Sequence, residues 1–529
     1  MKQLTAIIAT LMVCLTLQAQ FATIPLPQSV TTDAKGRTLD VASLEGITCD
    51  ATVDMMRNAQ FLSDYTGLPV ISQTDKKTVA VRLRLNTAMT NPEAYRLTTD
   101  PTGITIEGRT PAAVFYGIQV LRQALFAKPA TLPCGIVEST PRFAYRGMHL
   151  DVCRHFFDKE FVKHYIDILA LHGMNKLHWH ISDDQGWRIE IKKWPRLTQI
   201  GAWREQTVIG RNMGIFDGQR HGGYFTQADI REIVRYAQDR YITIIPEIDM
   251  PGHMVAALTA YPELGCTGGP YEVWGTWGVS DDILCAGNPK VYTFLTDVFD
   301  EVMDLFPSDI IHVGGDEAPK VRWKECPRCQ QKIRDERLQG TDKHPAEEKL
   351  QAYMVRYLEK HLAERGRRIM GWDELMEGDA DRTTIIMSWR DWSGSVDPAT
   401  LGYPCVKTPN STLYFDHYQL PQSAWSNTLL FGGNSTVEKV YNYEPAPDTL
   451  TPEQKKLVMG LQANLWTEYI AYPELAEYQV LPRMAALAEV QWLSPNKKDY
   501  DDFLKRLPNL LNLYKAEGWH YAPLPKKEN

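Results

Sequence analysis

The 529-residue sequence lacks any block of basic charge. Its 65 Asp and Glu residues outnumber 57 Lys and Arg residues, and the formal net charge of −8 is spread along the chain. A protein that binds a phosphate backbone or an anionic lipid surface needs concentrated positive charge. The composition therefore argues against nucleic acid and anionic membranes as partners, although it identifies no substrate.

Long apolar runs are also scarce. The run at residues 4–17 has 14 residues and follows Lys2, and it is too short to span a bilayer. A basic residue, an apolar run and a small residue such as Ala19 are together typical of an export signal. We expect residues 1–19 to be a signal peptide. The rest of the chain would then be exported to the periplasm or the medium without membrane insertion.

Cysteine is rare, with nine residues in the whole chain. Stability must therefore come from the core, with any disulfide acting locally. Cys266 and Cys285 bracket a loop rich in Gly and Trp, and we expect them to form a disulfide. Cys326 and Cys329 could be redox-active or half of a zinc site, but the sequence offers no second Cys-x-x-Cys pair. A loop disulfide or two free thiols is the preferred interpretation.

No fixed-period repeat is present, which argues against a solenoid. The chain instead shows two different patterns of apolar residues, and the first covers residues 20–140. Apolar residues alternate over 79–85 and a turn signal at 100–103 separates two strand-like segments, while helical spacing covers 52–65 and 111–126. These patterns predict a small α+β domain without a catalytic cluster.

Residues 141–529 alternate short apolar runs with amphipathic helical segments, which is typical of a parallel sheet. A capping-box pair, Thr226 and Asp229, opens one such helix. Expected strands lie near residues 146–152, 176–181, 242–248, 310–313, 368–370, 384–388, 412–415 and 458–464. Eight such units predict an α/β fold, a catalytic (β/α)8 TIM barrel preceded by the small α+β domain.

Active sites of such barrels lie at the carboxyl ends of the strands. Polar and aromatic residues follow the expected strands in order: Arg154; His178, His180, Asp183 and Asp184; Glu247, Asp249 and His253; Asp316 and Glu317; Trp372, Asp373 and Glu374; Trp389 and Arg390; Tyr414 and Asp416; Trp466 and Glu468. Their recurrence at one strand end after another predicts a catalytic site there.

Asp316 and Glu317 directly follow Gly314 and Gly315. Neighbouring side chains of a regular strand point to opposite faces, so two adjacent carboxylates can serve one ligand only where the strand bends into a loop. The glycines permit such a bend. Because no Lys-Ser or Lys-Thr follows them, a phosphate-binding loop is disfavoured. We interpret the carboxylates as a pair that divides acid and electrostatic roles.

Three tryptophans, Trp372, Trp389 and Trp466, each stand just past an expected strand. Indoles converging on a barrel mouth would wall a pocket suited to the apolar faces of a pyranose. Such a pocket accepts the end of a glycan chain better than its middle, so we expect exo action.

His178 and His180 share one face of their strand and could bind zinc. Barrel amidohydrolases carry such a pair on the first strand with a bridging Lys, whereas here it lies on the second. We favour hydrogen-bonded histidines and keep a metal-dependent barrel hydrolase as the less favoured alternative.

Several motifs follow one another along the barrel segment. They are the stretches 146–151, 154–157, 178–187, 247–253, 312–317, 371–374, 414–416 and 466–468, together with Trp389. In this order the motifs resemble the exported bacterial β-N-acetylhexosaminidases of glycoside hydrolase family 20. The resemblance covers nearly the whole chain after the signal, and the His-Val-Gly-Gly-Asp-Glu stretch at 312–317 is its most specific part.

The resemblance implies hydrolysis with retention, in which the acetamido oxygen of the substrate attacks its own anomeric carbon, without cofactor or metal. Glu317 would act as acid and then base, Asp316 would hold the acetamido N–H, and Tyr414 would bond the acetamido oxygen. The remaining implied roles are enclosure of the sugar by Trp372, Trp389 and Trp466, binding of hydroxyls by Arg154, Asp416 and Glu468, and support of the acid by Asp183 and His253.

Other interpretations stay open. Release of a disaccharide, as by a lacto-N-biosidase, would need a longer pocket, and a sugar-binding protein on an inactive barrel is the non-enzymatic alternative. The expected partner is a glycan with a terminal β-linked N-acetylglucosamine or N-acetylgalactosamine. The sequence leaves the choice between these epimers and the oligomeric state open.

Overall fold

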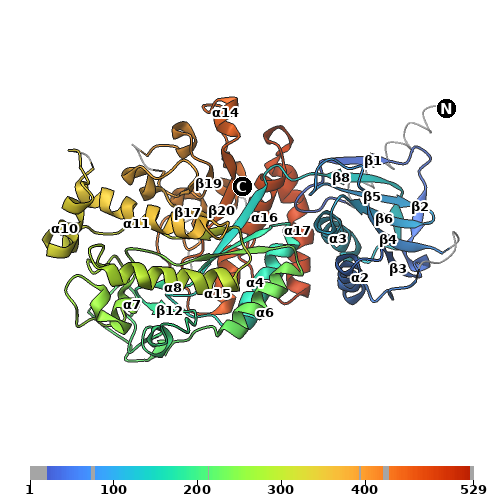
Figure 1. Ribbon diagram of the computed structural model, residues 1–529. Coiled ribbons are helices and arrows are strands. Elements are labelled where there is room, and N and C mark those ends of the chain that lie inside the picture. The colour runs from blue at the N-terminus through green and yellow to red at the C-terminus, as the bar shows by residue number, and fades with distance from the viewer. Residues whose placement is uncertain are drawn as a thin grey trace.

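A computed structural model describes residues 21–72, 78–212, 214–342, 344–391, 395–420 and 428–524. The expected signal peptide lies outside this range. No helix within the described part of the chain combines the length and the apolar character needed to cross a membrane. Figure 1 shows a small sheet domain, in blue, beside a larger domain built from the rest of the chain.

The small domain is a six-stranded mixed sheet with the order β1-β8-β5-β6-β4-β3. Its strands are β1 (Ser29–Thr32), β3 (Gly46–Cys49), β4 (Ala80–Leu85), β5 (Tyr95–Asp100), β6 (Gly103–Gly108) and β8 (Gly135–Ser139). Helices α2 (Val53–Thr66) and α3 (Pro111–Phe126) cover one face of the sheet (Figure 1). The predicted hairpin is confirmed, because β5 and β6 pair antiparallel across the turn at 100–103.

The large domain is a closed barrel of eight parallel strands, which confirms the predicted (β/α)8 fold. In barrel order the strands are β9 (Tyr145–Asp151), β10 (Lys176–His180), β15 (Thr243–Glu247), β16 (Ile310–His312), β17 (Arg368–Trp372), β18 (Ile385–Ser388), β19 (Cys405–Lys407) and β20 (Val458–Ala463). Seven of them coincide with expected strands to within a few residues.

The seventh strand corrects the sequence prediction. It is β19, Cys405–Lys407, whereas the expected strand at 412–415 is wrong. Asn410–Leu413 form the short helix α12, and Tyr414 makes only an isolated bridge to Asn464. A short apolar run fits a buried helix as well as a buried strand, so periodicity could not decide between them. The bridge places Tyr414 beside the end of β20.

Helices on the outside of the barrel vary in length around the ring. They include α4 (Lys159–Leu171), α6 (Gln227–Gln238), α8 (Pro289–Leu305), α11 (Ala346–Ala363), α15 (Pro473–Val480), α16 (Arg483–Trp492) and α17 (Tyr500–Ala516). After β17 and β18 the described residues form only the 3-10 turns η3 (Asp373–Gly378) and η4 (Pro398–Leu401).

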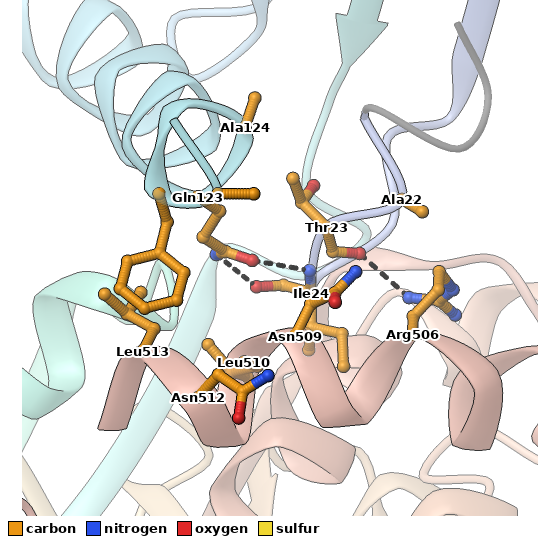
Figure 2. A pocket seen from close by; sticks show the side chains of 12 residues that line it. Ala22, Thr23, Ile24, Gln123, Ala124, Arg506, Asn509, Leu510, Asn512 and Leu513 are labelled. Atoms are coloured by element: carbon orange, nitrogen blue, oxygen red, sulfur yellow. Dashed lines mark hydrogen bonds between the residues drawn. The ribbon is translucent and has the colours of Figure 1, made fainter. Parts of the chain in front are cut away.

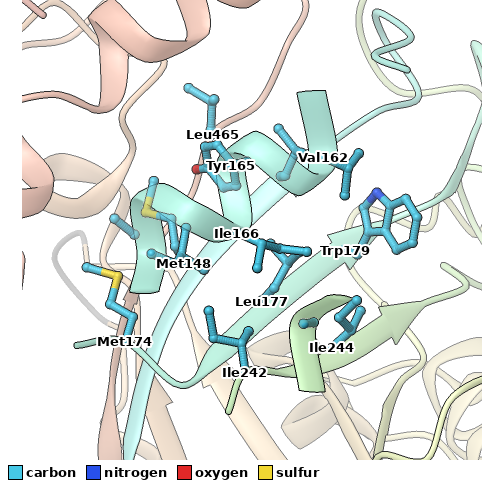
Figure 3. Close-up of a cluster of buried hydrophobic side chains, with 14 of the residues drawn as sticks. Met148, Val162, Tyr165, Ile166, Met174, Leu177, Trp179, Ile242, Ile244 and Leu465 are labelled. Atoms are coloured by element: carbon cyan, nitrogen blue, oxygen red, sulfur yellow. The ribbon is translucent and has the colours of Figure 1, made fainter. Parts of the chain in front are cut away.

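Apolar contacts between α4 and the barrel wall are typical of the core (Figure 3). Val162 and Ile166 of α4 lie over Leu177 of β10 and Ile244 of β15, and all four side chains are at most 3% exposed. Asp158 caps α4 by accepting a hydrogen bond from the Phe161 amide, as the sequence predicted. The capping box of Thr226 and Asp229 is likewise present at the start of α6.

The two domains share buried polar contacts. Arg146 of β9 is completely buried and donates hydrogen bonds of 3.1 and 2.7 Å to Glu93 of the small domain. Figure 2 shows the segment after the expected signal lying between α3 and α17. There Gln123 pairs with the backbone of Ile24, and Arg506 donates to the carbonyl of Thr23 at 2.8 Å. The small domain is thus joined firmly to the back of the barrel.

The predicted Cys266–Cys285 disulfide is wrong, since every cysteine in the described part of the chain is a free thiol. A bridge between Gly265 and Leu284 does bring Cys266 and Cys285 together. Helix α10 (Pro327–Asp335) adds Cys326 and Cys329 to the same place. Nothing in the sequence indicates that these four cysteines meet, because the two pairs lie far apart along the chain.

Candidate active site

A pocket opens at the carboxyl ends of the barrel strands. Its lining consists of Arg154, Asp316, Glu317, Trp372, Trp389, Asn410, Tyr414, Asp416, His417, Phe431, Trp466 and Glu468. Nine of these were candidates from the sequence, and the structure brings them together from six strand ends. Asp183 and His253 lie behind Glu317 and do not line the pocket. Asn410, His417 and Phe431 were not predicted.

The loop after β16 presents both carboxylates to the pocket. Gly314 and Gly315 have φ of 65° and 103°, and Glu317 has φ of 43°. A Cβ at Gly314 would lie 1.7 Å from Oδ1 of Asp249, so only glycine fits this turn. The bend turns Asp316 inward, where 13% of its side chain is exposed, and leaves Glu317 44% exposed at the pocket surface.

Asp316 is held next to a second buried carboxyl group, Asp249. Burial and the charge of Asp316 raise the pKa of Asp249 well above its usual range, which favours the protonated form of Asp249 beside Asp316. Burial raises the pKa of Asp316 itself to about 6. Its Oδ1 is buried and finds no hydrogen-bond partner among the described residues. This oxygen is free to accept a hydrogen bond from a ligand.

Asp249 was among the strand-end residues in the sequence but received no role there. The signal that could have found it is the Glu-Ile-Asp end of the third strand, which places Glu247 and Asp249 on one face.

A chain of charged groups backs Glu317. Nε2 of His253 lies 3.6 Å from Oε2 of Glu317, and its Nδ1 lies 3.2 Å from Oδ1 of Asp183. Burial alone would disfavour a charged ring, but Asp183 and Asp184 outweigh it and raise the pKa of His253 well above its usual value. The positively charged ring of His253 beside it in turn lowers the pKa of Glu317. Without a ligand, Glu317 is therefore a carboxylate at neutral pH.

Arg154 joins this chain to the pocket. Its Nη2 lies 2.9 Å from Oδ2 of Asp183, and its Nη1 lies 3.2 Å from Oδ2 of Asp151. The guanidinium also lies 4.9 Å above the ring of Trp466. Two carboxylates and an indole thus fix the orientation of the guanidinium at the pocket.

Beneath the pocket, Glu247 is surrounded by histidines. Nδ1 of His180 hydrogen-bonds to its Oε2, His178 lies 3.1 Å from the same oxygen, and His312 lies 2.9 Å from Oε1. Burial opposes a charge on His180, but Glu247 and Asp183 outweigh it and raise its pKa to about 10. The indole N–H of Trp372 also donates to Glu247, at 2.9 Å. The histidines therefore help to fix the floor of the pocket.

Aromatic rings enclose the pocket. Ring centroids lie 5.9 Å apart for Trp372 and Trp466, and 6.3 Å apart both for Trp466 and Tyr414 and for Tyr414 and Trp389. Trp389 donates its N–H to Glu374 at 3.0 Å. These residues make a continuous wall, of which Trp372 and Tyr414 are only 1% and 7% exposed.

Asp416 and Glu468 contribute two further carboxyl groups to the pocket lining. Burial and mutual repulsion raise the pKa of Asp416 well above its usual range, and burial raises that of Glu468. Oδ1 of Asp416 and Oε2 of Glu468 are buried and have no hydrogen-bond partner among the described residues. Buried polar atoms without partners are costly, so a ligand with hydroxyl groups is expected to satisfy them.

Phe431 and His417 form the outer rim. Their rings stack 6.3 Å apart at 14°, and Phe431 is 51% exposed. Phe431 lies far from any barrel strand along the chain, which is why the strand-end rule missed it, whereas His417 directly follows the predicted Asp416.

Two family profiles and a curated relative match this chain. The profile described as "Glycosyl hydrolase family 20, catalytic domain" matches residues 143–495, and "Glycosyl hydrolase family 20, domain 2" matches residues 20–138. A β-hexosaminidase of Porphyromonas gingivalis is 42% identical over 460 residues, which cover 85% of this chain and 57% of that protein. The chain thus spans little more than half of that relative's length.

Solved structures are similar over almost the whole chain. The GH20 β-N-acetylhexosaminidase of Streptomyces coelicolor has a TM-score of 0.82 and 31% identity, covering 96% of this chain and 98% of that one. A GH20 exo-β-N-acetylglucosaminidase of Vibrio harveyi, solved with N-acetylglucosamine, has a TM-score of 0.81 and 30% identity, covering 95% and 78%. With the family profile extending across the barrel, this chain belongs to glycosyl hydrolase family 20.

Proposed function

We propose that this protein is an exo-acting β-N-acetylhexosaminidase that releases terminal, non-reducing β-linked N-acetylhexosamine with retention of configuration. The observation that carries the proposal is the partnerless buried oxygen of Asp316 beside the exposed carboxylate of Glu317, inside an indole-walled pocket. The names of the relatives from P. gingivalis and V. harveyi support the same activity.

Asp316 and Tyr414 would act on the acetamido group. The free Oδ1 of Asp316 accepts the acetamido N–H, which turns the acetamido oxygen toward the anomeric carbon, and Tyr414 donates to that oxygen. As the oxygen attacks, positive charge develops on the oxazolinium ring, and the adjacent Asp316 carboxylate stabilises it. The substrate thus supplies the nucleophile that most retaining glycosidases take from a second carboxylate.

Glu317 would protonate the leaving oxygen and later remove a proton from water. Its lowered pKa without ligand requires a change on binding. A sugar that fills the pocket removes water from Glu317, and loss of solvent raises the pKa of a carboxyl group. Substrate binding therefore favours the acid form where it is needed. After the aglycone leaves, water returns beside Glu317, and the carboxylate acts as base.

Hydroxyl groups of the sugar would complete the polar network. The guanidinium of Arg154 would bind O3 and O4. Asp416 and Glu468, each with a buried oxygen that has no partner among the described residues, would bind O4 and O6. When the sugar binds, Asp416 and Glu468 therefore gain the hydrogen bonds that they lack without the sugar. Since an Arg can reach O3 and either O4 epimer, N-acetylgalactosaminides are expected as substrates alongside N-acetylglucosaminides.

The function is tested with matched 4-nitrophenyl β-glycosides of N-acetylglucosamine, N-acetylgalactosamine and glucose. Hydrolysis of the first two, none of the glucoside and inhibition by a thiazoline analogue of the oxazolinium ring support the proposal. Equal rates on glucoside and N-acetylglucosaminide would point to a protein nucleophile. Release of disaccharides from oligosaccharides, without monosaccharide, would contradict exo cleavage of single residues. Retained activity after chelation would dispose of the metal-dependent alternative.

We also propose that the protein is exported, because residues 1–19 have the pattern of a signal peptide. Amino-terminal sequencing of the protein recovered from the expressing bacterium tests this, with Gln20 expected as the first residue. An intact Met1 on all of the protein would contradict it.

A further inference from the structure

Four cysteines gather on the side of the barrel, outside the pocket. Cys285 and Cys329 are completely buried, Cys326 is 5% exposed and Cys266 is partly exposed. Sγ of Cys285 lies 3.6 Å from Cys329 and 3.7 Å from Cys326, and Sγ of Cys266 lies 3.8 Å from Cys329. All four sulfur atoms lie within 4.8 Å of one another. The proposed hydrolysis uses none of them.

These distances match a single tetrahedral ion. Four sulfurs at about 2.3 Å from a zinc ion stand about 3.8 Å from one another, as tetrahedral geometry requires. A disulfide would instead hold two sulfurs at about 2.05 Å. A cluster of several iron atoms needs more room than sulfurs this close together leave. We propose that Cys266, Cys285, Cys326 and Cys329 bind one structural Zn²⁺ as a closed tetrathiolate site.

Local structure prepares the thiolates for a metal. Cys326 is the residue that precedes helix α10, and Cys329 lies in its first turn, so both sulfurs sit at the positive end of the helix. That position favours the thiolate, which is the form that binds metal. Cys266 and Cys285 come from the opposite side, each directly after a residue of the Gly265–Leu284 bridge.

Backbone contacts hold the two halves of the site together. A Cβ at Gly287 would lie 2.1 Å from the carbonyl carbon of Arg328 and 2.4 Å from the amide nitrogen of Cys329, so glycine is needed for this approach. Nη2 of Arg328 donates to the carbonyl oxygen of Gly265 at 3.0 Å. The chain is therefore shaped to bring all four sulfurs together without a covalent bond between them.

The site would pin together the two loops that carry the catalytic candidates. One loop runs from β15 past Asp249 and His253 to Cys285, and the other runs from β16 past Asp316 and Glu317 to Cys326. Hydrogen bonds near the sulfurs also join the two loops. The indole N–H of Trp323 donates to the carbonyl of Leu284 at 2.8 Å, and the Leu284 amide donates to the carbonyl of Pro251 at 3.0 Å. Zinc would thus act as a cross-link where the sequence suggested a disulfide.

The test is the metal content of the purified full-length chain, measured by elemental analysis after dialysis against a weak chelator. One zinc per chain is expected, with an X-ray absorption spectrum that fits four sulfur neighbours at about 2.3 Å. Protein prepared with cobalt should show the visible absorption bands of a tetrahedral tetrathiolate. A thiol-blocking mercurial should release the metal.

The variants Cys285→Ser and Cys329→Ser should lose the zinc, whereas Cys405→Ser, a buried thiol of β19, should keep it. Loss of the metal should lower the Tm by at least about 5 °C. If both variants fail to fold, the cobalt spectrum of the unmutated chain still decides. Absence of any bound metal, bound iron in place of zinc, or disulfides among the four cysteines would overturn the proposal. Because these readouts need no substrate, they are independent of the proposed hydrolase activity.

Discussion

His253 lies with Nε2 3.6 Å from Oε2 of Glu317, while its Nδ1 contacts Asp183. Asp183 raises the pKa of His253, and the charged ring in turn lowers the pKa of Glu317. The ionisation of Glu317 is therefore set by a residue that does not line the pocket. His253 is therefore a positioning residue in the proposed mechanism.

Replacing Glu317 with Gln should remove the acid. We expect turnover of β-linked N-acetylglucosamine disaccharides to fall by about 10³-fold or more, because their leaving group needs a proton. Aryl glycosides with good leaving groups should lose less in their first step. Steady-state kinetics on both substrate types measure this, and an unchanged Tm shows that the fold is intact. Equal rates for variant and parent would refute the role of Glu317.

The profile of kcat/KM against pH should be bell-shaped with an acidic optimum. Asp316 has a raised pKa of about 6, and Glu317 has a lowered one, so the pair holds one proton only between these values. Above about pH 6 both groups are ionised and the acid is lost. Below the pKa of Glu317 both are protonated, and Asp316 cannot stabilise positive charge. The two limbs belong to the pair as a whole. A flat profile through pH 6 would contradict this assignment.

Changing Asp316 to Asn should lower kcat by about 10²-fold or more while KM changes little, because its charge is needed mainly in the transition state. Glu317, with its lowered pKa, is then the only titrating member of the pair, so the acid limb should disappear and the alkaline limb should move below pH 6. A defect confined to KM would count against the proposed role.

Replacing His253 with Ala should shift the acid limb to higher pH. The charged ring of His253 lowers the pKa of Glu317, so its loss lets that pKa rise. We expect the limb to move upward and kcat to fall about 10-fold or more as the acid loses its orientation. The pH profile is the deciding measurement, since a merely structural role for His253 would reduce kcat without moving the limb.

A methyl group at Gly314 should damage the site beyond its effect on the backbone. In Gly314→Ala the new Cβ would meet Oδ1 of Asp249 at 1.7 Å. Gly67→Ala is the matched control, because Gly67 also has positive φ, 75°, but no heavy atom lies within 4 Å of its added Cβ. The control should cost about 1 kcal/mol of unfolding free energy and keep full activity. Gly314→Ala should cost more and lose most activity; equal behaviour of the two would show that the contact with Asp249 is unimportant.

Replacing Phe431 at the outer rim of the pocket should raise KM for long substrates selectively. Phe431 is exposed and stacked on His417, so it can pack against the sugar beyond the cleaved bond. Phe431→Ala should raise KM for N-acetylglucosamine oligosaccharides about 3- to 10-fold, the equivalent of one aromatic contact. Kinetics on a 4-nitrophenyl glycoside serve as the comparison, and a similar rise there would place the effect inside the pocket.

The barrel could be predicted from the sequence because most of its strands appear there as short runs of neighbouring apolar residues. Apolar runs such as those of β9, β10 and β15 are separated by helices whose caps are themselves encoded, as at Asp158 and Thr226. The strand-end rule then located most of the pocket, since parallel strands deliver their following residues to one edge. It failed at β19, where three residues are too few to show a period, and at Phe431, which lies far from any strand end.

The sequence by itself thus determined the fold class, the family resemblance and the identity of the adjacent carboxylates, all of which depend on neighbouring residues. Only the tertiary structure decided that the pKa of Asp249 is raised beside Asp316, because a pKa depends on burial and on charges that distant segments contribute. It also decided that Cys266 and Cys285 meet Cys326 and Cys329. Spacing along a chain cannot reveal such a cluster, because two loops on separate barrel strands must first be folded against each other.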